Sequence, residues 1–258
     1  MANEIKELKV YNGGHILNEA MVEYRERQHD ELEGIIGISP WSPHQDASIN
    51  DKANAVQEGL AERIVNNDFK AMQESDIYVM DILPEGLGTI AELGIILGMK
   101  HQAQKTIDRL NEYKRLAEEL GEFDSVISIK EEIKEQQKIV DKPFLCYCSD
   151  IRQGHGKPYN DPDRAEFSTN QFIYGCVLEL TNGRGFISWE QVKQELDELA
   201  NGKTESQDKN YKDFEGSEFK NTVIHEEEYR QLTNKEKRKY FNKKNKKKSL
   251  KNKLKRGK

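Results

Sequence analysis

A strand, a glycine loop and a helix carry the residues best suited to chemistry. The apolar run 76–83, DIYVMDIL, predicts a buried strand, and the loop after it ends at Gly88. A helix is predicted to begin at Thr89, which places Glu92 in its first turn. Free backbone N–H groups make the start of a helix positive, which favours an ionised carboxylate. Glu92 is therefore the candidate nucleophile.

An alternative for the same residues needs no chemistry. Thr89 and Glu92 have the spacing of a capping box, in which the threonine caps the helix and the glutamate reaches back. The surrounding residues favour catalysis. Asp68 lies upstream in a predicted helix over 53–74, and Tyr11 ends a predicted strand over 8–11.

Each supporting residue also has a simpler interpretation. Asp68 is a candidate catalytic residue, or else a solvated acid on a helix. The Tyr11 hydroxyl is expected to hold the Glu92 carboxylate, or else Tyr11 is a half-buried strand aromatic. Trp41 follows Pro40 and is either a stacking surface for a base or a loop anchor. Asp81, inside the strand, is expected to orient the loop.

Three segments resemble the nucleoside 2-deoxyribosyltransferase family. They are Val10-Tyr11-Asn12-Gly13-Gly14, the pair Asn67-Asp68, and Gly88-Thr89-Ile90-Ala91-Glu92-Leu93-Gly94. Their order and spacing match, and together they span roughly residues 8 to 100. A weaker match follows, where Lys142-Pro143 leads into a strand and Asn170 lies in a later helix.

The resemblance implies an activity. Glu92 attacks C1' of a 2'-deoxyribonucleoside and forms a covalent deoxyribosyl-enzyme, and a free nucleobase then takes the sugar. Asp68 matches an active-site aspartate of the family and is the expected proton donor to the leaving base. Asn170 matches an asparagine that is donated to a neighbouring subunit's site, so we expect a homo-oligomer. Glu85 stands near a base-contacting aspartate, with a longer spacing to the helix. The expected substrate-binding residues are Gly13, Gly14, Trp41, Glu85, Gly88, Thr89 and Asn170. No cofactor or metal is needed.

Two other functions fit the same residues. One is an N-glycosidase for deoxynucleosides or deoxynucleotides, in which water accepts the sugar. The loop Asn12-Gly13-Gly14-His15 has no Ser or Arg suited to a 5'-phosphate, which favours free nucleosides. The other is a nonenzymatic nucleotide-binding module that keeps the fold without turnover.

Strands that alternate with helices predict the fold. Strands are expected over 8–11, 34–39, 76–83 and 143–148, and a helix with a capping box over 188–199. This order predicts an α/β domain over residues 1–200, with a doubly wound parallel sheet of flavodoxin-like order and about five strands. A Lys- and Glu-rich helical hairpin, broken at Gly121, is predicted to be inserted at 101–140. Loops 12–15, 41–51 and 84–92 should meet at the carboxyl ends of the strands.

Composition limits the remaining possibilities. Of the 258 residues 33% are charged, and no apolar run approaches the roughly 18 residues of a membrane helix. The three cysteines fit a reducing compartment, and we expect a cytoplasmic protein. Cys146 and Cys148 are expected in the core, and the histidines His15, His44 and His155 have no partner at metal-ligand spacing.

The last 58 residues differ from the rest of the chain. Residues 201–258 lose apolar periodicity and are predicted to be a linker and a disordered tail. Residues 235–258 hold fourteen Lys or Arg and one acid. Such a tail is either a nonspecific, salt-dependent contact for nucleic acid or a solubilising end.

Overall fold

A computed structural model of the chain describes residues 7–51, 54–151 and 169–202. The chain divides into two compact units, Met1–Asp213 and Phe214–Lys258, and all described residues belong to the first. The predicted basic tail and His155 therefore lie outside the described residues. Within the described ranges, no helix combines the length and apolar character needed to cross a membrane.

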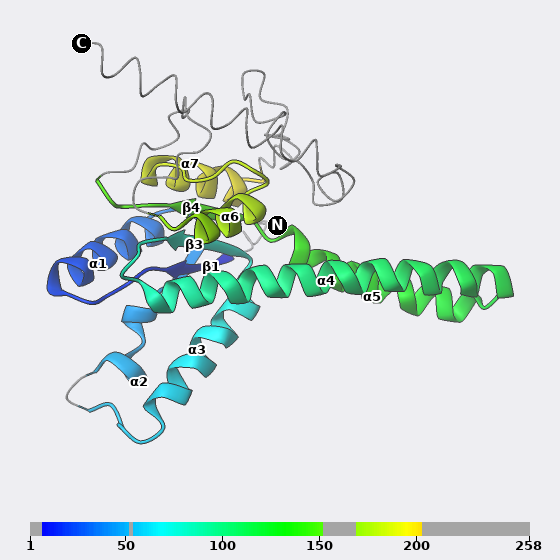
Figure 1. The fold of residues 1–258 in the computed structure, drawn as a ribbon, viewed down its shortest axis with the longest axis horizontal. Coiled ribbons are helices and arrows are strands. Elements are labelled where there is room, and N and C mark those ends of the chain that lie inside the picture. The colour runs from blue at the N-terminus through cyan, green and yellow to red at the C-terminus, as the bar shows by residue number, and fades with distance from the viewer. Residues whose placement is uncertain (1–6, 52–53, 152–168, 203–258) are drawn as a thin grey trace, which may run out of the picture. The chain divides into compact units, whose positions relative to one another are not determined.

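A parallel sheet forms the centre of the first unit (Figure 1). Its strands are β1 (Leu8–Gly13), β2 (Ile38–Trp41), β3 (Ile77–Asp81) and β4 (Phe144–Tyr147), in the order β2-β1-β3-β4. All three neighbouring pairs are parallel. The predicted parallel α/β sheet is thus confirmed with four strands in the described residues, where about five were expected.

Helices cover both faces of this sheet. On one face α1 (Glu19–Glu33) and α7 (Trp189–Ala200) share an apolar cluster with the sheet. On the other face α3 (Leu60–Glu74), α4 (Leu87–Leu120) and α6 (Gln171–Leu180) share a second cluster. In β3, Val79 belongs to the first cluster and Met80 to the second, because side chains alternate along a strand. Two buried faces explain why the strands have continuous apolar runs.

The second strand lies later in the chain than predicted. The expected strand 34–39 ended before Pro40, but β2 runs from Ile38 to Trp41 and contains the proline. Pro40 is the register partner of Val10 and lacks an N–H group for a second neighbour. It is tolerated because β2 is at the edge of the sheet. Trp41 therefore belongs to a strand and not to a loop.

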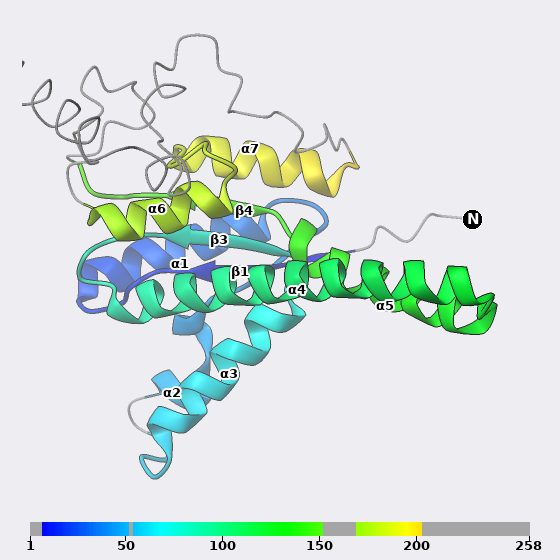
Figure 2. The same cartoon turned by 45° about the vertical axis from the view of Figure 1, so that its right-hand side comes forward.

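The fourth helix is longer than predicted. It is continuous from Leu87 to Leu120, so the buried helix and the first half of the hairpin are one element. The break at Gly121 is confirmed, with φ of 75° in the left-handed region. The chain then returns in α5 (Phe123–Asp141). Figures 1 and 2 show α4 and α5 running side by side beyond the sheet.

The short elements near the sheet edge complete the fold. A turn η1 (Pro43–Gln45) and a helix α2 (Ala47–Asn50) connect β2 towards α3. The predicted capping box of α7 is confirmed, since Ser188 Oγ accepts from Gln191 N at 3.2 Å and Gln191 Oε1 accepts from Ser188 N at 2.9 Å.

Candidate active site

Glu92 lies in the second turn of α4. The helix begins at Leu87 after the N-cap residue Gly86, and Ile90 N already donates to Gly86 O at 2.8 Å. The predicted placement of Glu92 in the first turn is wrong, because the helix begins at Leu87 and not at Thr89. The capping-box alternative is also wrong, because no side chain caps this helix. The loop closes two residues earlier than the sequence pattern indicated, which moves Glu92 away from the positive helix end.

The Glu92 carboxylate lies against the end of β1. A Cβ atom on Gly13 would be 3.1 Å from Glu92 Oε2 and 2.6 Å from the sulfur of Met80. Real Cβ atoms essentially never approach another atom within 3.0 Å. A larger residue at position 13 would displace the end of the Met80 side chain and press on the carboxylate that α4 places at the carboxyl end of a central strand.

Tyr11 and Asp68 complete a cluster around Glu92. Tyr11 is fully buried and Asp68 is 9% exposed, so the half-buried tyrosine and the solvated aspartate are both wrong alternatives. Tyr11 Oη, Asp68 Oδ1 and Glu92 Oε2 are buried and have no hydrogen-bond partner among the described residues. A buried polar atom without a partner costs free energy, so such atoms gather where a ligand or water binds.

Burial changes the proton affinities of this cluster. Burial first, and then the negative charge of Asp68, raises the pKa of Glu92 from 4.5 to about 7, against the lowering influence of the Tyr11 hydroxyl. That hydroxyl lies close to Glu92 but makes no hydrogen bond of proper geometry. Burial and the charge of Asp46 raise the pKa of Asp68 to about 6. Burial, Glu92 and Asp68 raise the Tyr11 pKa. Burial therefore outweighs any lowering of the Glu92 pKa by the helix, and the carboxyl is expected to be about half ionised near neutral pH.

Asp46 links the loop after β2 to α3. It caps α2 by accepting from Ser48 N at 2.9 Å, and it accepts from Asn67 Nδ2 at 2.8 Å. Asn67 directly precedes Asp68, so this contact fixes the helix turn that presents the aspartate. Asp46 is not among the residues predicted from the sequence, although an aspartate before a short helix is a typical N-cap.

Trp41 stacks on Tyr11. The two rings have centroids 5.4 Å apart and planes 19° from parallel. They are register partners on neighbouring strands, which brings their side chains to the same side of the sheet. The loop-anchor alternative is wrong. Contact of Trp41 with a base stays a prediction.

Two more unpartnered atoms follow Tyr11 in the chain. Asn12 Nδ2 donates to Ser42 Oγ at 3.0 Å, which leaves Asn12 Oδ1 buried without a partner in the described residues. His15 Nδ1 is likewise buried and unpartnered there, and His15 Cβ would be 3.3 Å from a Cβ on Gly86. Burial and the charge of Arg25 lower the His15 pKa, against Asp81 and Glu85. The neutral ring has one donor and one acceptor for a ligand.

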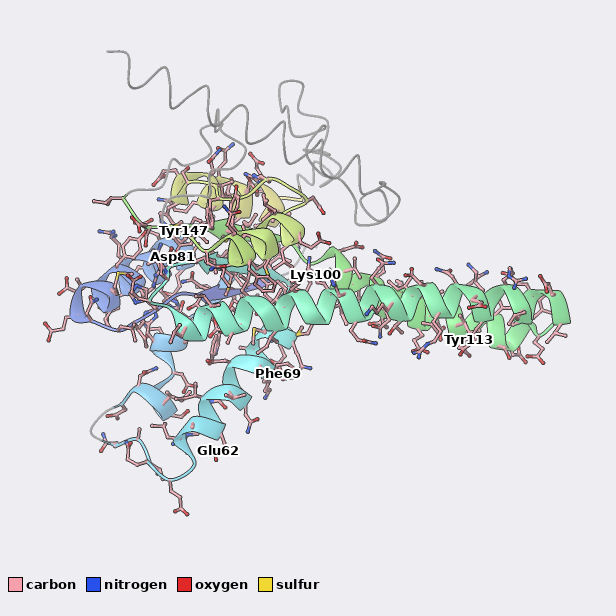
Figure 3. All side chains as sticks on the ribbon, in the orientation of Figure 1. Glu62, Phe69, Asp81, Lys100, Tyr113 and Tyr147 are labelled. Carbon is pink, nitrogen blue, oxygen red and sulfur yellow. The ribbon has the colours of Figure 1, made fainter. Side chains whose placement is uncertain are left out.

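A buried ion pair fixes the adjacent strand ends. Asp81 accepts from Arg25 Nη2 at 2.6 Å, from Ser149 N at 2.9 Å and from Ser149 Oγ at 2.7 Å. Arg25 Nη1 also donates to Tyr147, which neighbours Asp81 in the sheet (Figure 3). A Cβ on Gly14 would be 2.4 Å from Arg25, so Gly14 makes room for this network. Asp81 binds α1 and the segment after β4, and its expected role in orienting the glycine loop after β3 stays a prediction; nothing in the sequence pointed to Arg25.

The remaining predicted residues differ in position. Thr89 is buried, whereas Glu85 and Gly88 are exposed in and after the loop that begins α4. Asn170 is an exposed residue that caps α6, and its side chain accepts from Phe172 N at 2.9 Å. Its role in a neighbouring subunit's site stays a prediction.

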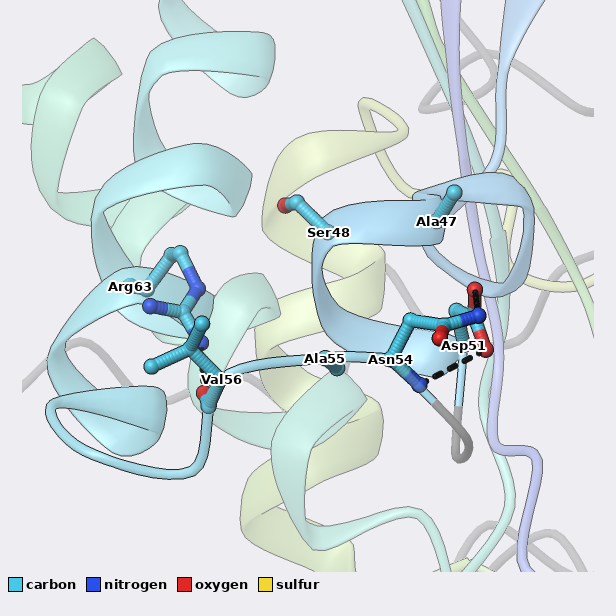
Figure 4. Close-up of a pocket in the computed structure, with 7 residues that line it drawn as sticks. All are labelled: Ala47, Ser48, Asp51, Asn54, Ala55, Val56 and Arg63. Carbon is cyan, nitrogen blue, oxygen red and sulfur yellow. Dashed lines mark hydrogen bonds between the residues drawn. The ribbon is translucent and has the colours of Figure 1, made fainter.

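A pocket of about 260 Å³ opens beside α2 and the start of α3 (Figure 4). It is lined by Ala47, Ser48, Asp51, Asn54, Ala55, Val56 and Arg63. None of the predicted site residues lines it. Unpartnered buried atoms define the candidate active site better than this open hollow does.

The described residues hold no group of three or more His, Cys, Asp or Glu side chains arranged for a metal ion. Cys146 and Cys148 lie in the core as predicted.

Comparison with known proteins assigns this chain to no family. No protein-family model matches the chain, and no curated protein is significantly similar to it. A solved structure titled "Crystal structure of conserved protein from Enterococcus faecalis V583" is similar, with 17% sequence identity and a TM-score of 0.46. The match covers 75% of this chain and 99% of that one. At this level the other protein carries no information on the activity of this one.

Proposed function

We propose that the chain is a nucleoside 2-deoxyribosyltransferase that exchanges the base of 2'-deoxyribonucleosides. One observation carries the proposal: the buried Glu92 carboxylate meets Tyr11 and Asp68 at the carboxyl end of the central strands, and all three have unpartnered oxygens. These are the residues that the family resemblance singled out. They come from three elements, β1, α3 and α4.

The chemistry assigns one role to each carboxyl group. A Glu92 oxygen attacks C1' of the sugar, the bond from C1' to the base nitrogen breaks, and its electron pair goes to the base. Protonated Asp68 gives its proton to the leaving base. A second base then attacks C1' with its ring nitrogen, the bond to Glu92 breaks, and the proton of the incoming base returns to Asp68. Two displacements give net retention.

The raised pKa values support this division. The pKa of Glu92 is about 7 and that of Asp68 about 6, so near neutral pH the pair is able to hold a single proton between them. The reactive form has that proton on Asp68. Sugar hydroxyls that donate to the unpartnered Glu92 oxygen would favour this form, because hydrogen bonds to a carboxylate lower its pKa.

Finer points of fold belong to the same proposal. The family implies a flavodoxin-like sheet of about five strands, and the observed order β2-β1-β3-β4 is compatible with it. Residues 184–187 are our candidate for the fifth position, since Ile187 N donates to Cys146 O of β4 at 2.9 Å. We also propose a homo-oligomer in the cytoplasm, with the tail as a nonspecific nucleic-acid contact.

Incubation with thymidine and adenine tests the activity. A transferase makes deoxyadenosine, whereas a hydrolase makes thymine and free deoxyribose, and a binding module makes neither. We expect deoxyadenosine, and its loss in Glu92→Ala. The control Glu112→Gln changes an exposed glutamate on α4 and should keep full activity. Mass spectrometry after a slow 2'-fluoro-deoxynucleoside should place a sugar adduct on Glu92. Wild-type exchange by Glu92→Ala would overturn the proposal.

A further inference from the structure

The helical hairpin beyond the sheet has an apolar surface that the domain does not cover. We call residues 101–141, the outer part of α4 together with α5, the arm. Five large apolar side chains near its turn are between 42% and 75% exposed: Tyr113, Leu116, Leu120, Phe123 and Ile127. Tyr113, Leu116 and Leu120 follow at helical spacing on α4, as do Phe123 and Ile127 on α5, on either side of Gly121.

The inner seam of the arm is also incompletely covered. Helix α5 has seven Phe, Val or Ile residues, but Val126 alone is fully buried. Ile129, Ile133 and Val140 continue its seam at coiled-coil spacing and remain half-buried. Two helices that pack only on each other cannot enclose their apolar positions. A further layer of helices is the usual way to bury such a seam.

The base of the arm is fixed to the sheet. Lys100 Nζ donates to the carbonyl of Lys142, and Lys142 Nζ donates to the Gln73 carbonyl at 2.7 Å. These contacts join α4, the end of α3 and the residue pair before β4. They lie at the amino end of the parallel strands, opposite the edge that holds Glu92. A partner on the arm would therefore leave the candidate active site open.

We infer that the arm is a self-association element, through which two copies of this chain pair their arms into a four-helix bundle. The charges on the arm favour a like partner over a nucleic acid or a strongly charged protein. Seven basic and ten acidic residues are interspersed along it. Several are already paired within one helix, such as Arg115 with Glu119 and Lys138 with Glu135.

The exposed area is sufficient for a specific contact. Aromatic side chains bury about 150–250 Å² each, and Leu and Ile lie toward the low end of that range, so five side chains that are about 60% exposed offer roughly 450–600 Å² per copy. Two copies bury roughly 900–1,200 Å² before any polar rim is added, which reaches the lower limit of about 1,200 Å² for stable interfaces. A two-fold axis uses the same surface on both copies, so no second complementary patch is needed.

Sedimentation and light scattering on the full chain test this inference. We expect wild type at micromolar concentration to have at least twice the 29.9 kDa mass of one chain, because the homo-oligomer proposed above uses another surface. Leu120→Glu with Phe123→Glu should weaken the pairing of the arms on the order of 100-fold or more and halve the mass of the assembly. The matched control Leu120→Met with Phe123→Leu keeps the apolar surface and should keep the mass of wild type.

Circular dichroism must show unchanged helix content, which we expect because both side chains are exposed. Should the first pair unfold the arm, Tyr113→Glu with Ile127→Glu examines the same surface. A monomeric wild type, a folded charge variant that dimerises like wild type, or a control that dissociates like the charge variant each overturns the inference. Base exchange is no part of the readout, so the result is independent of the proposed function.

Discussion

Replacement of Glu92 by glutamine should stabilise the protein, and more so at alkaline pH. The folded pKa of this carboxyl is about 7, against 4.5 for the free group. Between these values the folded state holds a proton that the unfolded state has lost. The stability that this group contributes is therefore fully present below pH 4.5 and is lost as the pH rises through 7.

The magnitude follows from the same two values. Each pKa unit is worth about 1.4 kcal/mol, so the rise from 4.5 to about 7 corresponds to about 3 kcal/mol in total. Most of it, about 2.5 kcal/mol, is lost between about pH 5 and 8.5. Glutamine has nearly the same shape and does not titrate. Glu92→Gln should therefore have a higher free energy of unfolding than wild type, and this difference should be about 2.5 kcal/mol larger at about pH 8.5 than at about pH 5.

Urea unfolding at the two pH values measures this difference. Asp68 is present in both proteins, so its own titration cancels to first order. The exposed control Glu112→Gln should show the same pH dependence as wild type. An equal difference between Glu92→Gln and wild type at both pH values would refute the conclusion that Glu92 is a buried, proton-binding carboxyl. The variant should also lose base exchange, which links the stability cost to catalysis.

Four further predictions test the neighbourhood of the site. Asp81→Asn leaves Arg25 buried without its counter-charge and should lower the free energy of unfolding, measured in urea, by about 3 to 5 kcal/mol. An exposed ion pair contributes about 1 kcal/mol at most, so a decrease smaller than about 1 kcal/mol would contradict a buried ion pair. Gly13→Ala puts a methyl group 2.6 Å from the Met80 sulfur and 3.1 Å from Glu92 Oε2, and the crowding should lower kcat about 10- to 100-fold; an unchanged kcat would show that Met80 and Glu92 adjust without loss of the reactive geometry. The exchange rate should have a bell-shaped pH profile between values near 6 and 7, because it needs Glu92 ionised and Asp68 protonated. Asp68→Asn should lower the rate about 10²- to 10⁴-fold and remove the fall on the alkaline side; a fall that persists would assign the proton to another group.

Local patterns in the chain were sufficient for the elements and for the identity of the central residues. Apolar runs bounded by glycine or proline located β1, β3 and β4 to within a few residues. The Ser188–Gln191 capping box and the glycine break at 121 were predicted correctly, because each depends on neighbours in sequence. The segments of the family resemblance contain Tyr11, Asp68 and Glu92, and the fold brings these three residues together.

Errors arose where a distant segment decided the outcome. The sequence predicts that the second strand ends before Pro40. In the structure Pro40 lies in the edge strand β2, where the absence of its N–H group breaks no hydrogen bond to a second neighbouring strand. The charge state of Glu92 was predicted from its own helix. Burial beneath β1 and the neighbouring charge of Asp68, far away in the chain, determine it instead.

The sequence by itself determined which segments are strands and helices and which acids stand at their ends, because apolar periodicity, turn residues and caps act over a few neighbouring positions. Only the tertiary structure decided the environment of those acids. The partner of Asp81 is Arg25, 56 residues away, and the solvation of Glu92 depends on Gly13, Tyr11 and α3. Burial and Coulomb interactions join groups that are close in space, and a linear pattern does not record those distances.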